Sequence, residues 1–517
     1  MLKHKKIAYL FFIPLLINGI WAQQKEKSLS LEDCILKTMK NNLSVAVEVL
    51  NPELADISVS KEREKFFPSL SFAYGTENTN SASFSWIDAA EQITTQFNDY
   101  AAQFVQLLPT GAELSVSLYA YMNETNRKFQ TINPRYGSTL YFNFTQPLLK
   151  NFGFKISRKE IIIAQNNRDA SENQLKTVLL DTIYNVEEAY WNLVYNIENL
   201  KVKRQSLELA RDLLAKNKRE VEIGTTAPIE ILSAQSEVAT READILQAEA
   251  MVKNSEDLLK TIINLAAEEE EADVEVVPVD KPTYEKKEVT LEEALRIALE
   301  NRPDLKASKI DVKSKEISLS YAKNQLLPDL SLRASYWSPG ISGTQLLYQD
   351  NDPLSGVVID TVPGTSSEAL KDTFNFRYKN WFVGVTLSIP LNTFLSRAEY
   401  AQAKTDLDQS VLRLKNQEQQ IFLEIKTAVR AVQTNYKRVE AYRVARELAE
   451  EKLEAEEKKF KVGLTTNYIV LQYQRDLADA QSAELRAVID YNLSLAGLDK
   501  ALGITLENRN IKIAELN

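Results

Sequence analysis

The sequence predicts a mixed, mainly α-helical protein built from two copies of one design. Each copy is expected to combine several strands with a very long antiparallel helical hairpin. Three observations lead to this prediction. Matching motifs recur at a constant spacing, glycine and proline are scarce (14 and 15 in 517 residues), and two long segments contain neither of them. Because glycine and proline interrupt helices, their absence favours long continuous elements.

The composition excludes several classes of function. With 44% hydrophobic and 26% charged residues, the chain lies outside the disordered class. Its net charge of -10 argues against nucleic-acid binding, which normally requires a basic face. The single histidine, His4, leaves no basis for His-based metal sites or Ser–His–Asp triads, and no cofactor is expected. Carboxylates are plentiful, but they lie on helical faces and linkers rather than at strand ends, so an enzyme is not predicted.

Residues 1–22 have the layout of a secretory signal peptide, because lysines precede an apolar run over 7–20 and Ala22 offers a small residue for cleavage. A retained signal anchor is the alternative, although the run is short for a spanning helix. No later segment reaches about 18 continuous apolar residues, so no transmembrane helix is expected. The single cysteine, Cys34, has no disulfide partner in the chain and is expected to be a half-buried helix residue.

An internal duplication is visible in matching positions. Ser30-Leu-Glu-Asp33 and Thr290-Leu-Glu-Glu293 are capping boxes that begin a helix in each half. From these boxes onward, equivalent residues follow at one constant spacing without gaps: Asn41 with Asn301, Ile57 with Ile317, Ser60 with Ser320, Pro68 with Pro328, and Leu70 with Leu330. Such a register indicates two repeats of one structural unit.

Short helices and then strands are expected in each half. The helices, over 30–67 and 291–327, end where Pro68 and Pro328 push the preceding residue out of the helical region. Strands with apolar residues at every second position follow, over about 69–147 and 329–391: Leu70, Phe72 and Tyr74; Val116 and Leu118; Leu140, Phe142 and Phe144; Val383, Val385, Leu387 and Ile389. The apolar face of these strands would cover a core in a soluble protein or face lipid in an outer-membrane barrel.

The long segments 154–223 and 391–462 contain neither glycine nor proline. A helix of about 65 residues would be roughly 100 Å long. In the first segment the apolar residues form a heptad seam, which predicts lengthwise packing against a neighbouring helix: Leu175, Leu179, Val186, Ala189, Leu193, Leu200, Leu207, Ala210, Leu214 and Val221. The second segment carries charges at i,i+4 spacing after Arg446, which suits a solvated surface.

Each long helix is followed by the same break. Gly224 and Gly463 are expected to adopt the left-handed conformation that ends a helix, with Thr or Asn nearby capping the helix that returns. The predicted division is a signal peptide (1–22), a first repeat (23–265, with its hairpin at 154–265), a solvated acidic linker (266–288), a second repeat (289–503, with its hairpin at 394–502) and a C-terminal tail (504–517).

With these features the chain resembles the TolC-like outer-membrane efflux channels over nearly its whole mature length. Ile223-Gly224-Thr225-Thr226 and Val462-Gly463-Leu464-Thr465 resemble the hairpin-tip motif with which that family docks a periplasmic adaptor protein. Thr145-Gln-Pro-Leu-Leu149 and Ser388-Ile-Pro-Leu391 resemble the junctions between its membrane strands and helices.

The resemblance implies a homotrimer in the cell outer membrane that extends into the periplasm. Strands of three protomers would close one β-barrel in lipid, and the partners would be an adaptor and an inner-membrane transporter. Four strands of one chain cannot enclose a pore, whereas twelve from three chains can, without leaving unpaired edges. One departure is the segment 97–122, which predicts an extra hairpin that either extends the barrel outward or adds strands. The cargo would be small molecules or polypeptides.

The resemblance also implies an aperture at the periplasmic end, ringed by acidic residues six positions after the tip glycine. Glu230 fits this position in the first repeat, whereas the second repeat has Ile469, with Gln472 where another acid is common. The alternative for Glu230 is a merely solvated helix residue. A rival for the whole chain is a periplasmic coiled-coil adaptor or scaffold, but duplicated hairpins and apolar strand faces count against it.

Overall fold

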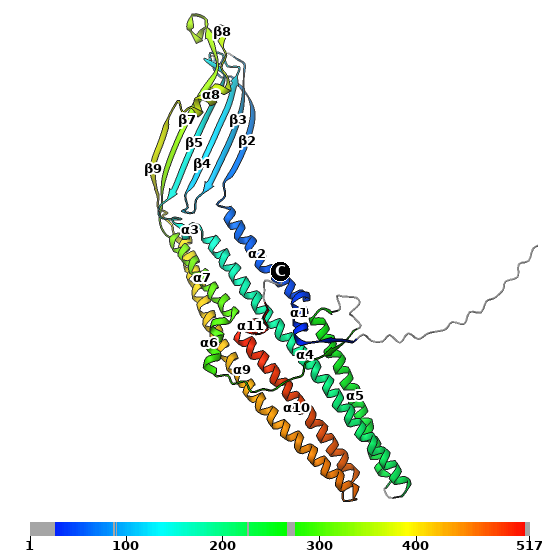
Figure 1. The fold of residues 1–517 in the computed structure, drawn as a ribbon. Coiled ribbons are helices and arrows are strands. Elements are labelled where there is room, and N and C mark those ends of the chain that lie inside the picture. The colour runs from blue at the N-terminus through cyan, green and yellow to red at the C-terminus, as the bar shows by residue number, and fades with distance from the viewer. Residues whose placement is uncertain (1–25, 86–87, 89, 225–226, 266–273, 512–517) are drawn as a thin grey trace, which may run out of the picture.

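The computed structural model describes residues 26–85, 88, 90–224, 227–265 and 274–511. Figure 1 shows an elongated molecule with a sheet at one end and long helices that run away from it to two hairpin tips. Within the described ranges, no helix combines the length and the apolar character that crossing a membrane requires. The predicted signal peptide, residues 1–22, lies outside the described residues.

The two predicted hairpins are confirmed. The first consists of α4 (Lys159–Glu222) and α5 (Ile229–Ile262), and the second of α9 (Phe394–Lys461) and α10 (Asn467–Leu502). A short helix, α3 (Phe154–Ser157), precedes α4. The predicted seam of α4 is buried from Leu175 to Ala210, and α4 packs lengthwise against α5, α2, α7 and α10. The 64 residues of α4 span roughly 100 Å.

Two short helices precede the strands in each half, and the pairs have equal lengths: α1 (Leu31–Asn41) and α2 (Leu43–Glu64), α6 (Leu291–Asn301) and α7 (Pro303–Asn324). The capping box at Ser30 is complete, and the hydroxyl of Thr290 accepts from the backbone N–H of Glu293 at 3.4 Å. Helices α2 and α7 end three residues before the predicted ends, because the chain closes there with tighter i→i+3 turns.

Part of the region predicted as a solvated linker is an ordered strand, which corrects that prediction. β6 (Glu275–Pro278) pairs in parallel with β1 (Glu26–Leu29). Tyr190 of α4, fully buried, holds this ribbon, because its hydroxyl lies 2.8 Å from Asp280 Oδ2 and 3.2 Å from the backbone nitrogen of Asp280. Burial of Val276 in the strand and of Val274 just before it stabilises this segment. The apolar pattern is too short to stand out in the sequence beside the acidic run.

Cys34 is also more buried than predicted. Its side chain is fully enclosed between α1 and the core of the first repeat, and this burial raises the pKa of the thiol to about 12. At the other terminus, the predicted tail begins with α11 (Thr505–Asn508), and Arg509 beyond it forms an ion pair of 2.6 Å with the buried Glu187. The two ends of the described chain therefore pack onto the same middle region of α4.

In the described part of the chain, the large sheet is antiparallel throughout and contains seven strands. They are β2 (Ser69–Ala82), β3 (Gln92–Leu107), β4 (Glu113–Thr125), β5 (Ile132–Pro147), β7 (Asp329–Tyr348), β8 (Val358–Val362) and β9 (Asn380–Ser388). The order is β2-β3-β4-β5-β7, and both β9 and the short β8 pair with the outer edge of β7. The segment 97–122 thus adds strands β3 and β4 instead of extending the sheet outward.

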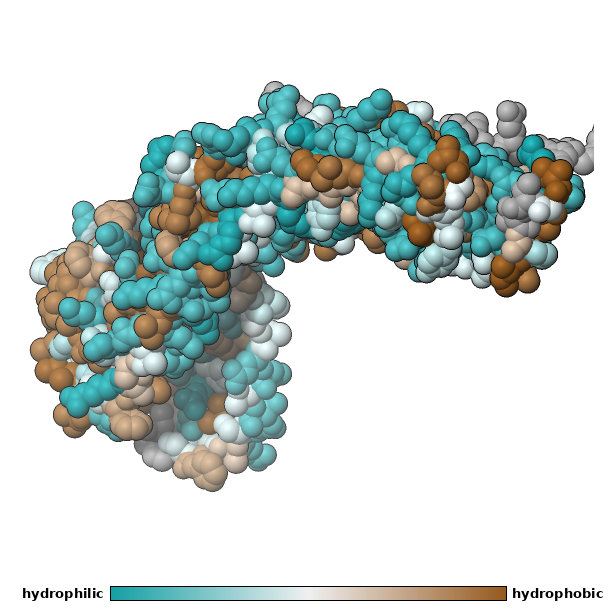
Figure 2. Space-filling view, turned by 90° about the horizontal axis from the view of Figure 1, so that it is seen from below, coloured by the Kyte–Doolittle hydropathy of each residue, from teal (hydrophilic) through white to brown (hydrophobic). Residues whose placement is uncertain are grey.

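Opposite residues of an antiparallel pair share a face, so the register divides the sheet into two faces. One face, called here the apolar face, carries aliphatic and aromatic side chains from every long strand: Leu70, Phe72, Tyr74, Phe104, Val116, Leu118, Leu140, Phe142, Tyr336, Val383, Val385 and Leu387. The opposite face, called the polar face, carries Ser71, Gln103, Ser115, Ser117, Asn143, Arg333, Ser335 and Thr386. In Figure 2 the brown residues gather along the outer border of the sheet end.

A helix, α8 (Ser366–Phe374), packs on the apolar face near the end of the sheet that lies far from the long helices. Gly340 and Ser138 make room for it, because a Cβ at Gly340 would lie 2.0 Å from the carbonyl oxygen of Ala369. The hydroxyls of Ser138 and Thr373 lie 2.6 Å apart in this contact. Two 3-10 helices, η3 (Gln349–Asn351) and η4 (Pro353–Ser355), lie in the connection that leads to β8.

Candidate functional site: the hairpin tips

The two predicted tip glycines have the expected left-handed conformation, with φ of +78° at Gly224 and +74° at Gly463. A Cβ at either position would meet no atom within 4 Å among the described residues, so glycine is required by the turn and not by close packing. The predicted docking residues Thr225 and Thr226 lie outside the described residues. Leu464 is 77% exposed and Thr465 is half-buried.

The prediction that Thr or Asn side chains cap the returning helices is wrong for α10, whereas at α5 the nearby Thr225 and Thr226 lie outside the described residues. The N-cap of α5 is Pro228, which has no side-chain oxygen, and Thr466 at the N-cap of α10 makes no side-chain capping bond. At both tips a left-handed glycine and backbone turns reverse the chain.

Exposed apolar residues surround both tips, where no described part of the chain covers them. We call the set the tip surface: Ile223, Ile229, Leu232, Val462, Leu464 and Tyr468, which are between 61% and 77% exposed. Figure 2 shows brown groups at these free ends of the hairpins. Exposed apolar patches of this kind are typical of surfaces that contact another protein.

The three predicted aperture residues lie close to the tips but in different surroundings. Glu230 is half-buried, and within the described part of the chain its Oε2 atom is buried without a hydrogen-bond partner. Ile469 is half-buried, whereas Gln472 is exposed in a groove of about 440 Å³ between α5 and α10. The groove is also lined by Leu232, Tyr468, Glu237 and Arg475, but not by Glu230 or Ile469.

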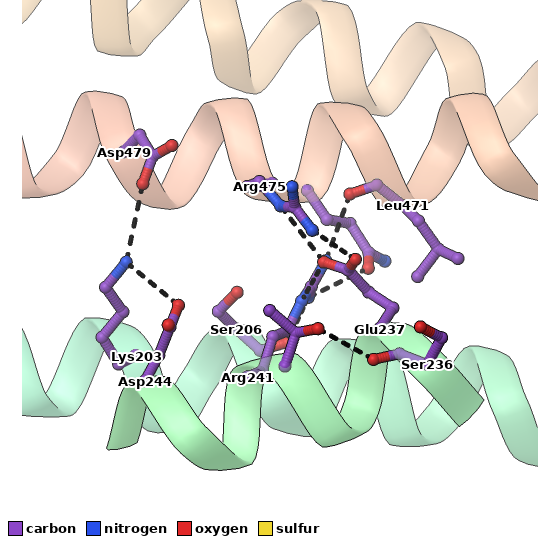
Figure 3. Close-up of polar contacts among 11 residues, drawn as sticks. Lys203, Ser206, Ser236, Glu237, Arg241, Asp244, Leu471, Arg475 and Asp479 are labelled. Atoms are coloured by element: carbon purple, nitrogen blue, oxygen red, sulfur yellow. Dashed lines mark hydrogen bonds and ion pairs between the residues drawn. The ribbon is translucent and has the colours of Figure 1, made fainter. Parts of the chain in front are cut away.

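A polar network that the sequence analysis missed joins the two hairpins next to this groove (Figure 3). Its centre is Arg241 of α5, which is 4% exposed. The guanidinium donates to Glu237 at 3.0 Å, to the carbonyl of Leu471 on α10 at 3.1 Å, and to the carbonyl of Ser206 on α4. Arg475 of α10 forms a second ion pair with Glu237, so one carboxylate serves both hairpins.

A further bridge lies beside the network, where Lys203 of α4 is 3.5 Å from Asp479 of α10 and 3.8 Å from Asp244 of α5. The sequence does hold a signal for the network. Ala234, Arg241 and Ala248 occupy successive heptad positions of α5, and all three are buried. A charged residue in an apolar seam therefore marked the place where α5 meets a polar group of another helix.

The chain combines paired helical hairpins with exposed apolar tips and an antiparallel sheet that has one apolar and one polar face. This combination is typical of membrane channels. A model of the outer membrane efflux protein family matches residues 35–265 and 294–504 of the chain. The chain therefore belongs to this family of outer-membrane transport proteins. The match covers both repeats and decides against a periplasmic adaptor or scaffold.

Individual relatives agree with this membership. The outer membrane protein TolC of Vibrio cholerae is 23% identical over 453 residues, covering 82% of this chain and 95% of that protein. Nodulation protein T of Rhizobium leguminosarum is 21% identical over 351 residues, covering 68% and 69%. Among solved structures, the outer-membrane channel OprN has a TM-score of 0.65 at 16% identity and covers 92% of this chain and 89% of its own. The Campylobacter jejuni CmeC channel has a TM-score of 0.63 at 15% identity, with 99% of both chains covered.

The network predicts that Arg241→Met loosens the contact between the two hairpins. The change removes charge-assisted hydrogen bonds to Glu237 and to the carbonyls of Ser206 and Leu471, and a hydrogen bond to a charged group contributes about 1.5–3 kcal/mol, while Glu237 keeps its ion pair with Arg475. Arg211→Met is the matched control, because the 2.8 Å ion pair between Arg211 and Glu242 is exposed and lies within one hairpin, where such pairs contribute about 0–1 kcal/mol. We expect faster protease cleavage near the tips in Arg241→Met only. Equal cleavage rates in the two variants would show that the network does not hold the hairpins together.

Proposed function

We propose that three copies of this chain form an outer-membrane channel that belongs to a tripartite efflux or type I secretion system. The channel would carry small molecules or polypeptides from an inner-membrane transporter to the exterior. The observation that carries this proposal is the combination, in one chain, of a sheet with one apolar face and two free edges and of helices roughly 100 Å long. The sheet suits lipid, and the helices are long enough to cross a wide aqueous space.

The trimer is supported by surfaces that a single chain leaves open. Among the described strands, none lies beside the outer edges of β2 and β9, and unpaired backbone groups are costly in lipid. Exposed apolar residues also follow α9, which suits packing against another protomer: Leu412, Leu423, Val444 and Leu448 are between 48% and 65% exposed. Both features are satisfied when neighbouring protomers stand side by side around an axis.

Extraction with a mild detergent, followed by mass measurement in the detergent micelle, tests the assembly. We expect a particle with the mass of three chains, each close to 58.7 kDa before any processing. A monomer that stays in solution without detergent would contradict the channel.

The partner at the tips is proposed to be a periplasmic adaptor protein, held by the tip surface around Gly224, Gly463 and Leu464. Leu464→Glu is expected to abolish export while the trimer still assembles, because Leu464 is 77% exposed and supports no core. Leu464→Met keeps the apolar character and serves as the control. Loss of the trimer in Leu464→Glu, with adaptor binding retained by the remaining protein, would assign the residue a structural role instead.

We also propose that three copies of Glu230 converge on the aperture and favour cations. A constriction with walls of low dielectric constant concentrates the field of its charges on passing ions. Glu230→Gln is expected to lower the cation preference in single-channel recordings, and Ile469→Asp to raise it by restoring an acid in the second repeat. Unchanged selectivity and unchanged block by multivalent cations in Glu230→Gln would show that Glu230 lies away from the pore.

A further inference from the structure

A barrel of twelve strands made by three chains would need four strands from each chain, and the described sheet has more long strands than that. Six of its strands are long and run side by side: β2, β3, β4, β5, β7 and β9. Strands β3 and β4 pair with their neighbours along almost their whole length, through the registers Ser69↔Val105 to Ala82↔Gln92 and Glu113↔Thr145 to Asn123↔Arg135. The short β8 lies at the far end of β7 and does not add to the width at the level of β9.

We propose that three protomers close a barrel of eighteen strands, in which β9 of one protomer pairs with β2 of the next. The proposal rests on the trimeric channel proposed above and specifies its membrane wall. Each protomer would contribute all six long strands, so that β3 and β4 are part of the barrel and not an appendage outside it.

The direction of the edge strands permits this closure. In an antiparallel sheet of six strands the first and the last run in opposite directions, so β2 and β9 of neighbouring protomers meet antiparallel. Their exposure agrees with an edge role. Nearly every residue of β2 and most residues of β9 are exposed, whereas the residues of β3, β4, β5 and β7 are mainly half-buried.

The two faces of the sheet restrict the register in which β9 of one protomer would pair with β2 of the next. Apolar residues must stand opposite apolar ones, so Leu70, Phe72 and Tyr74 of β2 would face the row Val383, Val385 and Leu387 of β9. Ser71 would then lie on the polar face beside one of Gly384, Thr386 or Ser388. A slip by one residue would place serine and threonine in lipid, which makes the face assignment a strong constraint.

The width of the pore follows from the number of strands. Barrel diameter grows roughly linearly with strand number, so eighteen strands give about one and a half times the diameter of twelve, in the range where barrels leave an aqueous channel. The helix α8 does not fill this lumen, because it packs on the apolar face through Gly340, Ser138 and Thr373. It would lie outside the wall near the outer membrane surface, where its exposed neighbours Phe374, Tyr378 and Trp381 suit the lipid interface.

A cryo-electron microscopy structure of the trimer in lipid nanodiscs tests the count directly. We expect eighteen strands, with β3 and β4 between β2 and β5 in every protomer. A trimer with twelve strands and a displaced β3–β4 hairpin would overturn this inference and leave the proposed function intact. A chain that forms no trimer would instead overturn the proposed function.

Cysteine accessibility gives an independent test on adjacent residues of the added strand β4. In a Cys34→Ala background, Ser117→Cys lies on the polar face and Leu118→Cys on the apolar face. A membrane-impermeant thiol reagent is expected to label Ser117→Cys at least tenfold faster than Leu118→Cys in intact outer membranes. Similar labelling of both would show that β4 lies outside the wall.

The seam is tested by pairing Ser71→Cys with a second cysteine on β9 in the same background. We expect a disulfide between protomers for one of Gly384→Cys, Thr386→Cys and Ser388→Cys. Val383→Cys, Val385→Cys and Leu387→Cys, on the opposite face, serve as controls and should give none. Absence of cross-linked protomers from all three polar-face variants, in a preparation that is still trimeric, would contradict the β9–β2 seam.

Discussion

The packing seam of α4 is the contact on which the rest of the structure depends. This helix contacts α1 and α2 of its own repeat, its hairpin partner α5, and α7 and α10 of the second repeat. The fully buried residues Leu179, Val186 and Leu193 lie along it in one large core, together with residues of α1, α5 and the β6 strand. Helices this long gain stability mainly from tertiary burial rather than from intrinsic propensity. Without the seam, neither hairpin would have a fixed partner, and the sheet would have no rigid base.

The sheet end and the helical end of the chain differ in how their backbone hydrogen bonds are satisfied. Along the helices, backbone hydrogen bonds are satisfied within each segment, so contacts between helices depend on side-chain packing alone. In the sheet, each backbone group needs a neighbouring strand, and among the described residues the outer edges of β2 and β9 have none. In the proposed trimer these edges must therefore be paired, whereas the helices need no neighbour for their backbone hydrogen bonds.

Much of the fold could be predicted from the sequence because the relevant signals are long. The absence of glycine and proline over 154–223, the heptad seam from Leu175 and the matching breaks at Gly224 and Gly463 fix the two hairpins almost to the residue. The β6 strand was missed because four residues beside an acidic run are too few to show a period. The burial of Cys34 was underestimated because it depends on β1, α4 and α5, which are distant in sequence.

The candidate site could be predicted only in part, for a related reason. The turn at each tip is local, so glycine identifies it, whereas the role of Arg241 depends on carbonyls of Ser206 and Leu471 in two other helices. Likewise, sequence alone left open whether 97–122 would extend the barrel or add strands. That choice depends on pairing with β2 and β5, which is a property of the sheet and not of the segment.

The polar network also explains how long hairpins can meet at one register. An apolar seam tolerates a shift by a whole heptad, because leucine packs nearly as well in the next hole. A buried guanidinium does not tolerate it, because Arg241 would lose its carbonyl acceptors and would remain charged in an apolar setting. Glu237 adds a second condition, since it must reach Arg241 and Arg475 together. The hairpins are thus held in one alignment by buried polar contacts that lie close to the tips.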